Sequence, residues 1–142
     1  MPISECRKWY NDWVEKNAKG KVLDIGKSIH WYYGFDTIDN NPDLKPTITG
    51  DICKTSIKND TYDMVLCMGM YEFVENPQEM VDEIYRILKK EGVVLFGFVG
   101  KEYVPYKDNW IFYKKGDIYF GNFKIKDTKD LKDYHFIICK KV

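Results

Sequence analysis

A buried strand, a helix and a second buried strand follow one another in the middle of the chain, and this order constrains the fold more than any other feature. The run Tyr62–Met68 is almost continuously apolar, as in strands covered on both faces. The dipeptide Asn76-Pro77 then supplies a helix cap and a first-turn proline, and an apolar stripe of helical period follows. We expect this helix to end at Lys89–Gly92 and Val93–Val99 to form the next buried strand. These segments predict a parallel α/β core.

Shorter segments complete the predicted architecture. Ser4 can cap an amphipathic helix that ends near Gly20. Strands are expected at Lys21–Ile25, at Asp36–Asp39 and from Thr47 to Gly50-Asp51, and an antiparallel pair at Asp117–Lys126 and Tyr134–Lys141. The stretch Gly100–Lys115 is rich in turn formers and is expected to be a loop over the sheet edge. The fold class is therefore α/β, with a mostly parallel sheet, few helices and a C-terminal antiparallel β-hairpin.

Composition excludes several classes of protein. The 142 residues include 22 basic and 22 acidic side chains without a dense basic cluster, so a phosphate-tracking nucleic-acid surface is not indicated. The four cysteines are far apart and form no C-x-x-C pair, which argues against a metal site and for reduced thiols in a cytoplasmic protein. The sequence has no apolar run long enough to span a membrane and no leader pattern at its start.

The first predicted strand points to a nucleotide-like ligand. The residues Val22–Gly26 run from apolar side chains into Asp24 and end on a glycine, which allows backbone to approach a ligand closely. Lys27 and Ser28 stand where a glycine-rich turn would continue. Acids also end the next two strands, at Asp39 and Asp51. One such acid can simply cap a turn, but three at successive strand ends favour a ligand site.

The chain resembles the class I S-adenosylmethionine-dependent methyltransferases. The resemblance rests on Tyr62-Asp63-Met64-Val65, on Tyr71-Glu72-Phe73-Val74 and on Ile84–Gly92, which together are similar to the family run "FDxV…LEHV…EIyRvLKPGG". It implies a Rossmann-like methyltransferase fold with residues 1–142 as a single methyltransferase-like domain, and S-adenosylmethionine as the cofactor.

The resemblance also implies a role for residues at the strand ends. Asp24 and Gly26 would lie beside the amino-acid end of the cofactor, and Asp39, with Asn40 next to it, would accept hydrogen bonds from the ribose hydroxyls. Asp51 would accept from the adenine amine, with the backbone of Ile52 alongside. Cys67, Met68 and Gly69 would line the floor beneath the sulfonium and the adenosine.

The reaction implied is methyl transfer to a small-molecule or sugar-type acceptor, aided chiefly by alignment. The sequence does not choose among four candidates for a general base: His30, Tyr71, Glu72 and Asp108. Phe73 replaces the histidine of the family motif, and the segment 104–112 is weakly similar to a "DYWRFT" element of relatives that act on sugars.

Two other functions stay open. The incomplete glycine turn, the missing helices and Phe73 would also suit a non-catalytic binding or scaffolding module of the same fold. A nicotinamide-dependent oxidoreductase ranks last, because it needs G-x-G-x-x-G after the first strand. A parallel sheet needs both faces covered, so we expect either the first helix and residues 31–35, or a second subunit in a homodimer, to cover the barer face.

Overall fold

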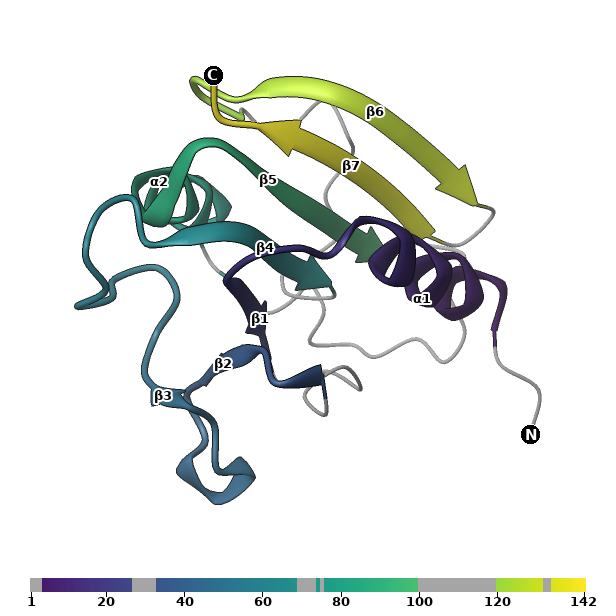
Figure 1. The fold of residues 1–142 in the computed structure, drawn as a ribbon. Helices are drawn as coiled ribbons and strands as arrows, with labels where there is room; N and C mark the ends of the chain where they lie inside the picture. Colours follow the sequence, from purple (N-terminus) through teal and green to yellow (C-terminus); the bar gives the residue numbers. More distant parts are fainter. Residues whose placement is uncertain (1–3, 27–32, 69–73, 75, 100–119, 132–133) are drawn as a thin grey trace.

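The computed structural model describes residues 4–26, 33–68, 74, 76–99, 120–131 and 134–142. Within this part of the chain, the strands form a seven-stranded sheet in the order β3-β2-β1-β4-β5-β7-β6 (Figure 1). The strands are β1 Val22–Ile25, β2 Asp36–Asp39, β3 Ile48–Thr49, β4 Tyr62–Met68, β5 Leu88–Val99, β6 Lys124–Leu131 and β7 Tyr134–Lys140.

The first five strands are parallel, and β7 joins β5 and β6 in an antiparallel arrangement. The strand order reverses between β1 and β4, because the chain moves outward from β1 to β3 and then returns to the other side of β1. In open α/β sheets, ligands bind outside the carboxyl ends of the strands at such a reversal. The topology therefore confirms the predicted fold class and marks one edge of the sheet as the place to look for a site.

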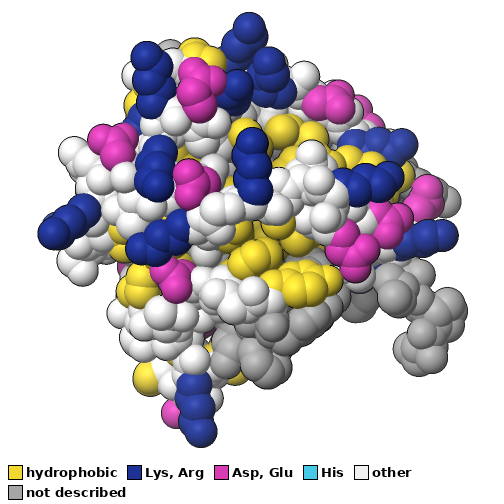
Figure 2. Space-filling model, in the orientation of Figure 1, with side chains coloured by type: hydrophobic (Ala, Val, Ile, Leu, Met, Phe, Trp, Pro, Cys, Tyr) yellow, Lys and Arg dark blue, Asp and Glu magenta, His cyan; other side chains and the backbone are white. Residues whose placement is uncertain are grey.

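One helix packs on each face of the sheet (Figure 1). The helix α1, Glu5–Asn17, covers one face, where its buried side chains meet those of β4, β5 and β7. The helix α2, Pro77–Ile87, covers the other face and contributes to the larger apolar cluster. On the face that carries α1, acidic and basic side chains are interspersed, and apolar side chains show through near the middle (Figure 2). Neither helix is long and apolar enough to cross a membrane, and no other helix among the described residues is.

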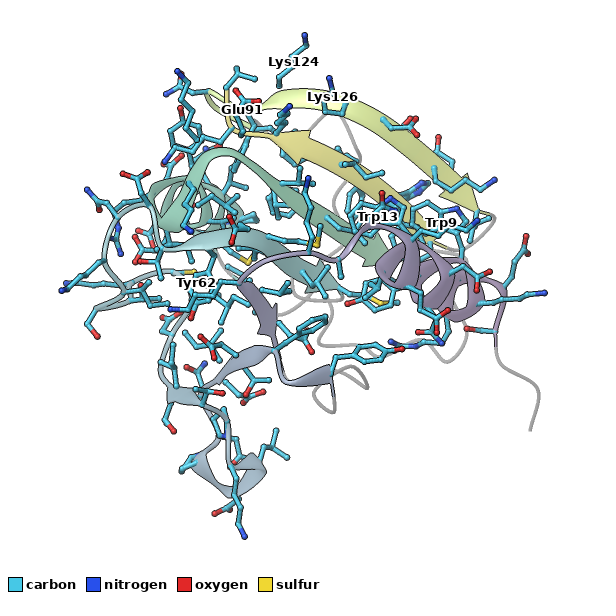
Figure 3. All side chains as sticks on the ribbon, viewed as in Figure 1. Trp9, Trp13, Tyr62, Glu91, Lys124 and Lys126 are labelled. Atoms are coloured by element: carbon cyan, nitrogen blue, oxygen red, sulfur yellow. The ribbon has the colours of Figure 1, made fainter. Side chains whose placement is uncertain are left out.

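The helix α1 begins where the sequence predicts. Ser4 is its N-cap, and the Ser4 hydroxyl accepts a hydrogen bond from the backbone N–H of Arg7 at 3.3 Å. Tyr10 and Val14 are fully buried, and Trp9 lies over the ring of Phe136 with the ring centres 4.4 Å apart (Figure 3). Phe35 also packs against this cluster. The first helix and part of the segment 31–35 therefore cover this face, which was the first of the two arrangements that the sequence suggested.

The helix α2 starts at its predicted cap but ends earlier than expected. The Asn76 side chain accepts from the backbone N–H of Glu79, and Pro77 occupies the first turn. The predicted end at Lys89–Gly92 is wrong, because Leu88 already has extended backbone, is fully buried and pairs with Tyr62 of β4. Burial of Leu88 in the sheet therefore outweighs the helix-ending pattern of the four residues that follow it.

The C-terminal hairpin forms, but its first strand lies later in the chain than predicted. The prediction placed this strand at Asp117–Lys126, whereas β6 spans Lys124–Leu131 and pairs with β7 along its length. The polar residues expected to connect the strands belong to β6 itself, which is exposed at all but its last position. Alternating apolar patterning cannot reveal an edge strand that is in water on both faces. The predicted loop at Gly100–Lys115 lies outside the described residues.

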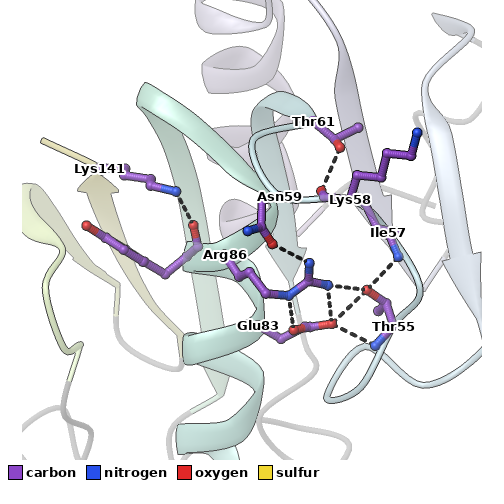
Figure 4. A network of polar contacts seen from close by, with 9 residues as sticks. Thr55, Ile57, Lys58, Asn59, Thr61, Glu83, Arg86 and Lys141 are labelled. Atoms are coloured by element: carbon purple, nitrogen blue, oxygen red, sulfur yellow. Dashed lines mark hydrogen bonds and ion pairs between the residues drawn. The ribbon is translucent and has the colours of Figure 1, made fainter.

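The side chain of Lys141 closes the carboxyl end of α2. Its ammonium group donates to the carbonyl oxygen of Tyr85 at 2.8 Å (Figure 4). It also donates to the carbonyl oxygen of Leu88 at 2.7 Å and pairs with the Asp60 carboxylate at 3.0 Å. It also lies 4.6 Å from the centre of the Tyr85 ring. Cations stabilise helix carboxyl ends, where carbonyl groups lack partners within the helix.

Replacing Lys141 by methionine is expected to lower the free energy of unfolding by about 2 kcal/mol, because two carbonyl groups lose a charged donor. The measurement is urea unfolding followed by circular dichroism. The matched control is Lys140→Met, which removes a lysine whose partner, Glu91, is exposed, and it should change stability little. Equal losses in the two variants would contradict a specific role for Lys141.

Candidate functional site

A cleft of about 490 Å³ opens at the carboxyl ends of β1, β2 and β3. Its walls combine the strand ends, the turn after β3 and the first turn of α2. The lining residues are Ile25, Gly26, Ile38, Asp39, Asn40, Gly50, Asp51, Ile52, Cys53, Val74, Asn76 and Glu79. Five of the nine residues predicted to bind a cofactor are therefore brought together: Gly26, Asp39, Asn40, Asp51 and Ile52.

The ends of β1 and β2 are fixed by backbone contacts. The N–H of Gly26 donates to the carbonyl oxygen of Ile38 at 2.8 Å, and Gly26 has a φ of +83°, a conformation that favours glycine. At the end of β2, one carboxylate oxygen of Asp39, Oδ1, accepts from the backbone N–H of Asn41 at 2.8 Å. This bond orients the half-buried carboxylate and leaves acceptor capacity on it for a ligand in the cleft.

A tight turn after β3 carries the second acid of the cleft. The Asp51 carboxylate accepts from the backbone N–H of Cys53 at 2.9 Å, and the Asp51 carbonyl accepts from the N–H of Lys54 at 3.1 Å. Ile52 is buried in the apolar core, 4% exposed, and anchors the turn from beneath. Asp51 itself is exposed. Its position suits an acceptor for a polar group at the outer end of a ligand.

The first turn of α2 forms the opposite wall, and sequence reasoning missed it. Asn76 and Glu79 both line the cleft, although the sequence analysis identifies Asn76 only as a helix cap and does not single out Glu79. The signal that could have found them is topological. Because α2 follows the carboxyl end of β4, its first turn lies at the same edge of the sheet as the ends of β1 and β2.

The cleft is acidic where the structure describes it. All the charged side chains among its lining residues are carboxylates, namely Asp39, Asp51 and Glu79. Burial, the Asp51 charge and the hydrogen bond to Asp51 raise the pKa of the Cys53 thiol to about 11, with smaller contributions from Glu79 and Glu83. The thiol is therefore protonated at neutral pH, and it is a poor nucleophile.

Three of the other predicted cofactor residues do not line the cleft. Asp24 is buried, 1% exposed, and does not line this cleft. Cys67 is buried in the core beside Met80, with the two sulfur atoms 3.8 Å apart, and Met68 is half-buried and packs against the cluster beneath α1. Gly69 and the four candidate bases, His30, Tyr71, Glu72 and Asp108, lie outside the described residues, and their roles stay predictions.

Comparisons with known proteins relate the chain to methyltransferases. A family model described as a methyltransferase domain matches residues 35–96, which include β2, β3, β4, α2 and most of β5. An uncharacterized protein of Methanocaldococcus jannaschii is 32% identical over 80 residues, which are 52% of this chain. The match spans 39% of the length of that protein.

Solved structures of methyltransferases share the fold. A SAM-dependent methyltransferase from Thermotoga maritima superposes with a TM-score of 0.70 at 16% identity and covers 96% of both chains. A SAM-dependent methyltransferase from Aquifex aeolicus gives a TM-score of 0.66 at 13% identity, with 97% of this chain and 90% of that chain covered. Residues 35–96 are thus similar to a methyltransferase domain, and the chain has the fold of S-adenosylmethionine-dependent methyltransferases.

Proposed function

We propose that this protein binds S-adenosylmethionine in the cleft at the ends of β1–β3 and transfers its methyl group to a small-molecule acceptor. The observation that carries the proposal is the meeting of Asp39 and Asp51, from neighbouring strand ends, in one cleft with Gly26. Ionised carboxylates only accept hydrogen bonds. They therefore suit a ligand that presents donors, such as a ribose diol and an exocyclic amine.

Each residue has a separate task in this proposal. Asp39, oriented by its bond to Asn41, holds the ribose hydroxyls. Asp51 accepts from the adenine amine, and the buried Ile52 keeps that turn against the core. Gly26, which has no side chain, leaves space beside the end of β1 for the amino-acid portion. S-adenosylmethionine supplies the methyl group as a sulfonium for in-line displacement, and the protein contributes mainly alignment.

The charge of the cleft favours this ligand over phosphate-bearing nucleotides. Dinucleotide sites usually place a pyrophosphate against a glycine-rich turn and a helix N-terminus. Among the described lining residues the charged groups are all acidic, so they repel phosphates and attract a sulfonium. The finer identity of the acceptor, a small or sugar-type molecule, rests on the resemblance of segment 104–112.

Calorimetric titration of the purified protein tests the proposal. We expect saturable binding of S-adenosylmethionine and S-adenosylhomocysteine and no detectable heat with NAD at the same concentrations. Absence of heat with both sulfur ligands would refute the cofactor assignment. Binding of NAD with equal affinity would refute the electrostatic argument.

A further inference from the structure

We propose that Glu83 is a positioning residue for base recognition, acting through Thr55 on the turn that carries Asp51. The inference rests on the proposed function, because it assigns the adenine end of the cofactor to that turn. Among the described residues, Glu83, Thr55 and Arg86 do not line the cleft. Their effect on the geometry of the cleft therefore passes through the residues that do.

The segment between β3 and β4 needs an external support. It contains the turn at Asp51–Lys54 and otherwise runs without helix or strand to Thr61. Thr55 comes directly after this turn. Both its backbone N–H and its hydroxyl donate to the same Glu83 oxygen, Oε2, at 2.7 Å each (Figure 4).

Arg86 fixes Glu83 in place. Its guanidinium donates to both Glu83 oxygens, at 2.7 Å to Oε1 and 2.8 Å to Oε2. It also donates to Asn59 at 2.8 Å and to the Thr55 hydroxyl at 3.2 Å. A two-point arginine–carboxylate pair has a fixed geometry, so Glu83 is a rigid acceptor for Thr55. Arg86 thereby joins both halves of the segment to α2.

Glu83 also lies one helical turn after a residue of the cleft wall. Glu79 lines the cleft, and the i, i+4 spacing places Glu83 on the same side of α2. The Cys53 thiol, which lines the cleft, experiences the charges of both Glu79 and Glu83. The helix thus contacts the ligand space with its first turn and holds the Asp51 turn with its second. A shift of Thr55 relative to α2 would move Asp51 relative to the opposite wall.

The preference of the site for adenine over hypoxanthine shows whether Glu83 positions the Asp51 turn or only stabilises the fold. Asp51 can accept a hydrogen bond from the adenine amine, whereas hypoxanthine presents a carbonyl oxygen at that position. The probe is therefore the ratio of dissociation constants for S-inosylhomocysteine and S-adenosylhomocysteine, measured by calorimetry on the full chain. We expect the wild type to prefer adenine by at least roughly tenfold, since a site built to pair with a donor rejects an analogue without it.

The variants remove the support without touching the cleft. Glu83→Gln weakens the pair with Arg86, and Thr55→Val removes one of the two bonds to Glu83 while keeping a similar shape. We expect either change to reduce the adenine preference by at least roughly threefold, because a loosened acceptor loses hydrogen-bond geometry. Thr55→Ser keeps the hydroxyl and should retain the wild-type ratio. Asp82→Asn also removes one negative charge from α2, at the position next to Glu83, where Asp82 accepts a hydrogen bond from Gln78. This control should also retain the wild-type ratio.

The outcomes distinguish the two proposals. A reduced ratio in Thr55→Val that Thr55→Ser restores supports positioning, even if Glu83→Gln fails to fold. If the wild type binds S-adenosylhomocysteine, and folded Glu83→Gln and Thr55→Val keep the wild-type ratio of dissociation constants, Glu83 has no positioning role. The cofactor assignment then stays intact. A wild type that binds neither ligand removes both proposals.

Discussion

Replacing Asp39 by asparagine is expected to weaken binding of S-adenosylhomocysteine roughly a hundredfold, since two hydrogen bonds to a charged carboxylate are worth about 3 kcal/mol together. The asparagine side chain keeps an oxygen that can accept from the N–H of Asn41, as Asp39 Oδ1 does at 2.8 Å. The change therefore removes the charge while preserving the local turn. Calorimetric titration of both proteins under the same conditions measures the difference.

The matched control is Asp43→Asn. Asp43 lies in the short 3₁₀ helix η2, Pro42–Leu44, which follows β2, and its side chain is exposed and does not line the cleft. Asp43→Asn changes the net charge by the same amount and should bind like the wild type. If Asp39→Asn binds as tightly as the control, the ribose lies elsewhere and the site is wrong even though the protein binds the cofactor.

Acidification is expected to remove up to about 3 kcal/mol of stability through Glu83 alone. The hydrogen bonds from Arg86, followed by those from Thr55, lower the pKa of Glu83 from its ordinary value of 4.5 to about 2, although partial burial opposes the shift. A carboxyl group whose pKa is lower in the folded state stabilises the fold above the unfolded pKa. This contribution is complete above pH 4.5 and decreases as the pH falls from 4.5 to about 2.

Urea unfolding at pH 7, 4 and 3 measures this effect as the difference between wild type and Glu83→Gln. The difference should shrink at low pH, since the variant has no carboxyl group to protonate at this position. Asp82→Asn serves as the reference for the other acids that titrate in the same range. A difference that stays constant from pH 7 to pH 3 would contradict the coupling of Glu83 to Arg86.

The central elements were predictable because their sequences are locally consistent with their burial. Tyr62–Met68 and Asp36–Asp39 form strands with the predicted bounds, and Asn76 caps α2 as its chemistry indicates. The sequence was misleading or silent where contacts between distant parts of the chain determine the local structure. Leu88 leaves the helix because β4 offers it a buried partner, and Lys141 completes the end of that helix from more than 50 positions along the chain. Neither contact has a local sequence signal.

In the candidate site, too, only the residues with a local sequence signal could be predicted. Asp39 and Asp51 were predicted because each follows a strand that the sequence reveals, and both line the candidate cleft. Glu79 was missed because its place in the cleft depends on how α2 lies against the sheet, which no motif records. The Thr55–Glu83–Arg86 network likewise joins a loop to a helix 28 positions later, and its residues are ordinary surface types in the sequence.

Within the described part of the chain, β3 and β6 are the edge strands of the sheet, and edge strands bear on aggregation and self-association. β3 is only two residues long, and β6 carries five charged side chains in eight positions, with Lys124 and Lys126 projecting away from the sheet (Figure 3). Short edges and charged edges both discourage the addition of a foreign strand. Continuation of this sheet into a second molecule is therefore disfavoured at both ends. These edge strands therefore favour a face of the molecule over a sheet edge as the contact surface of any homodimer.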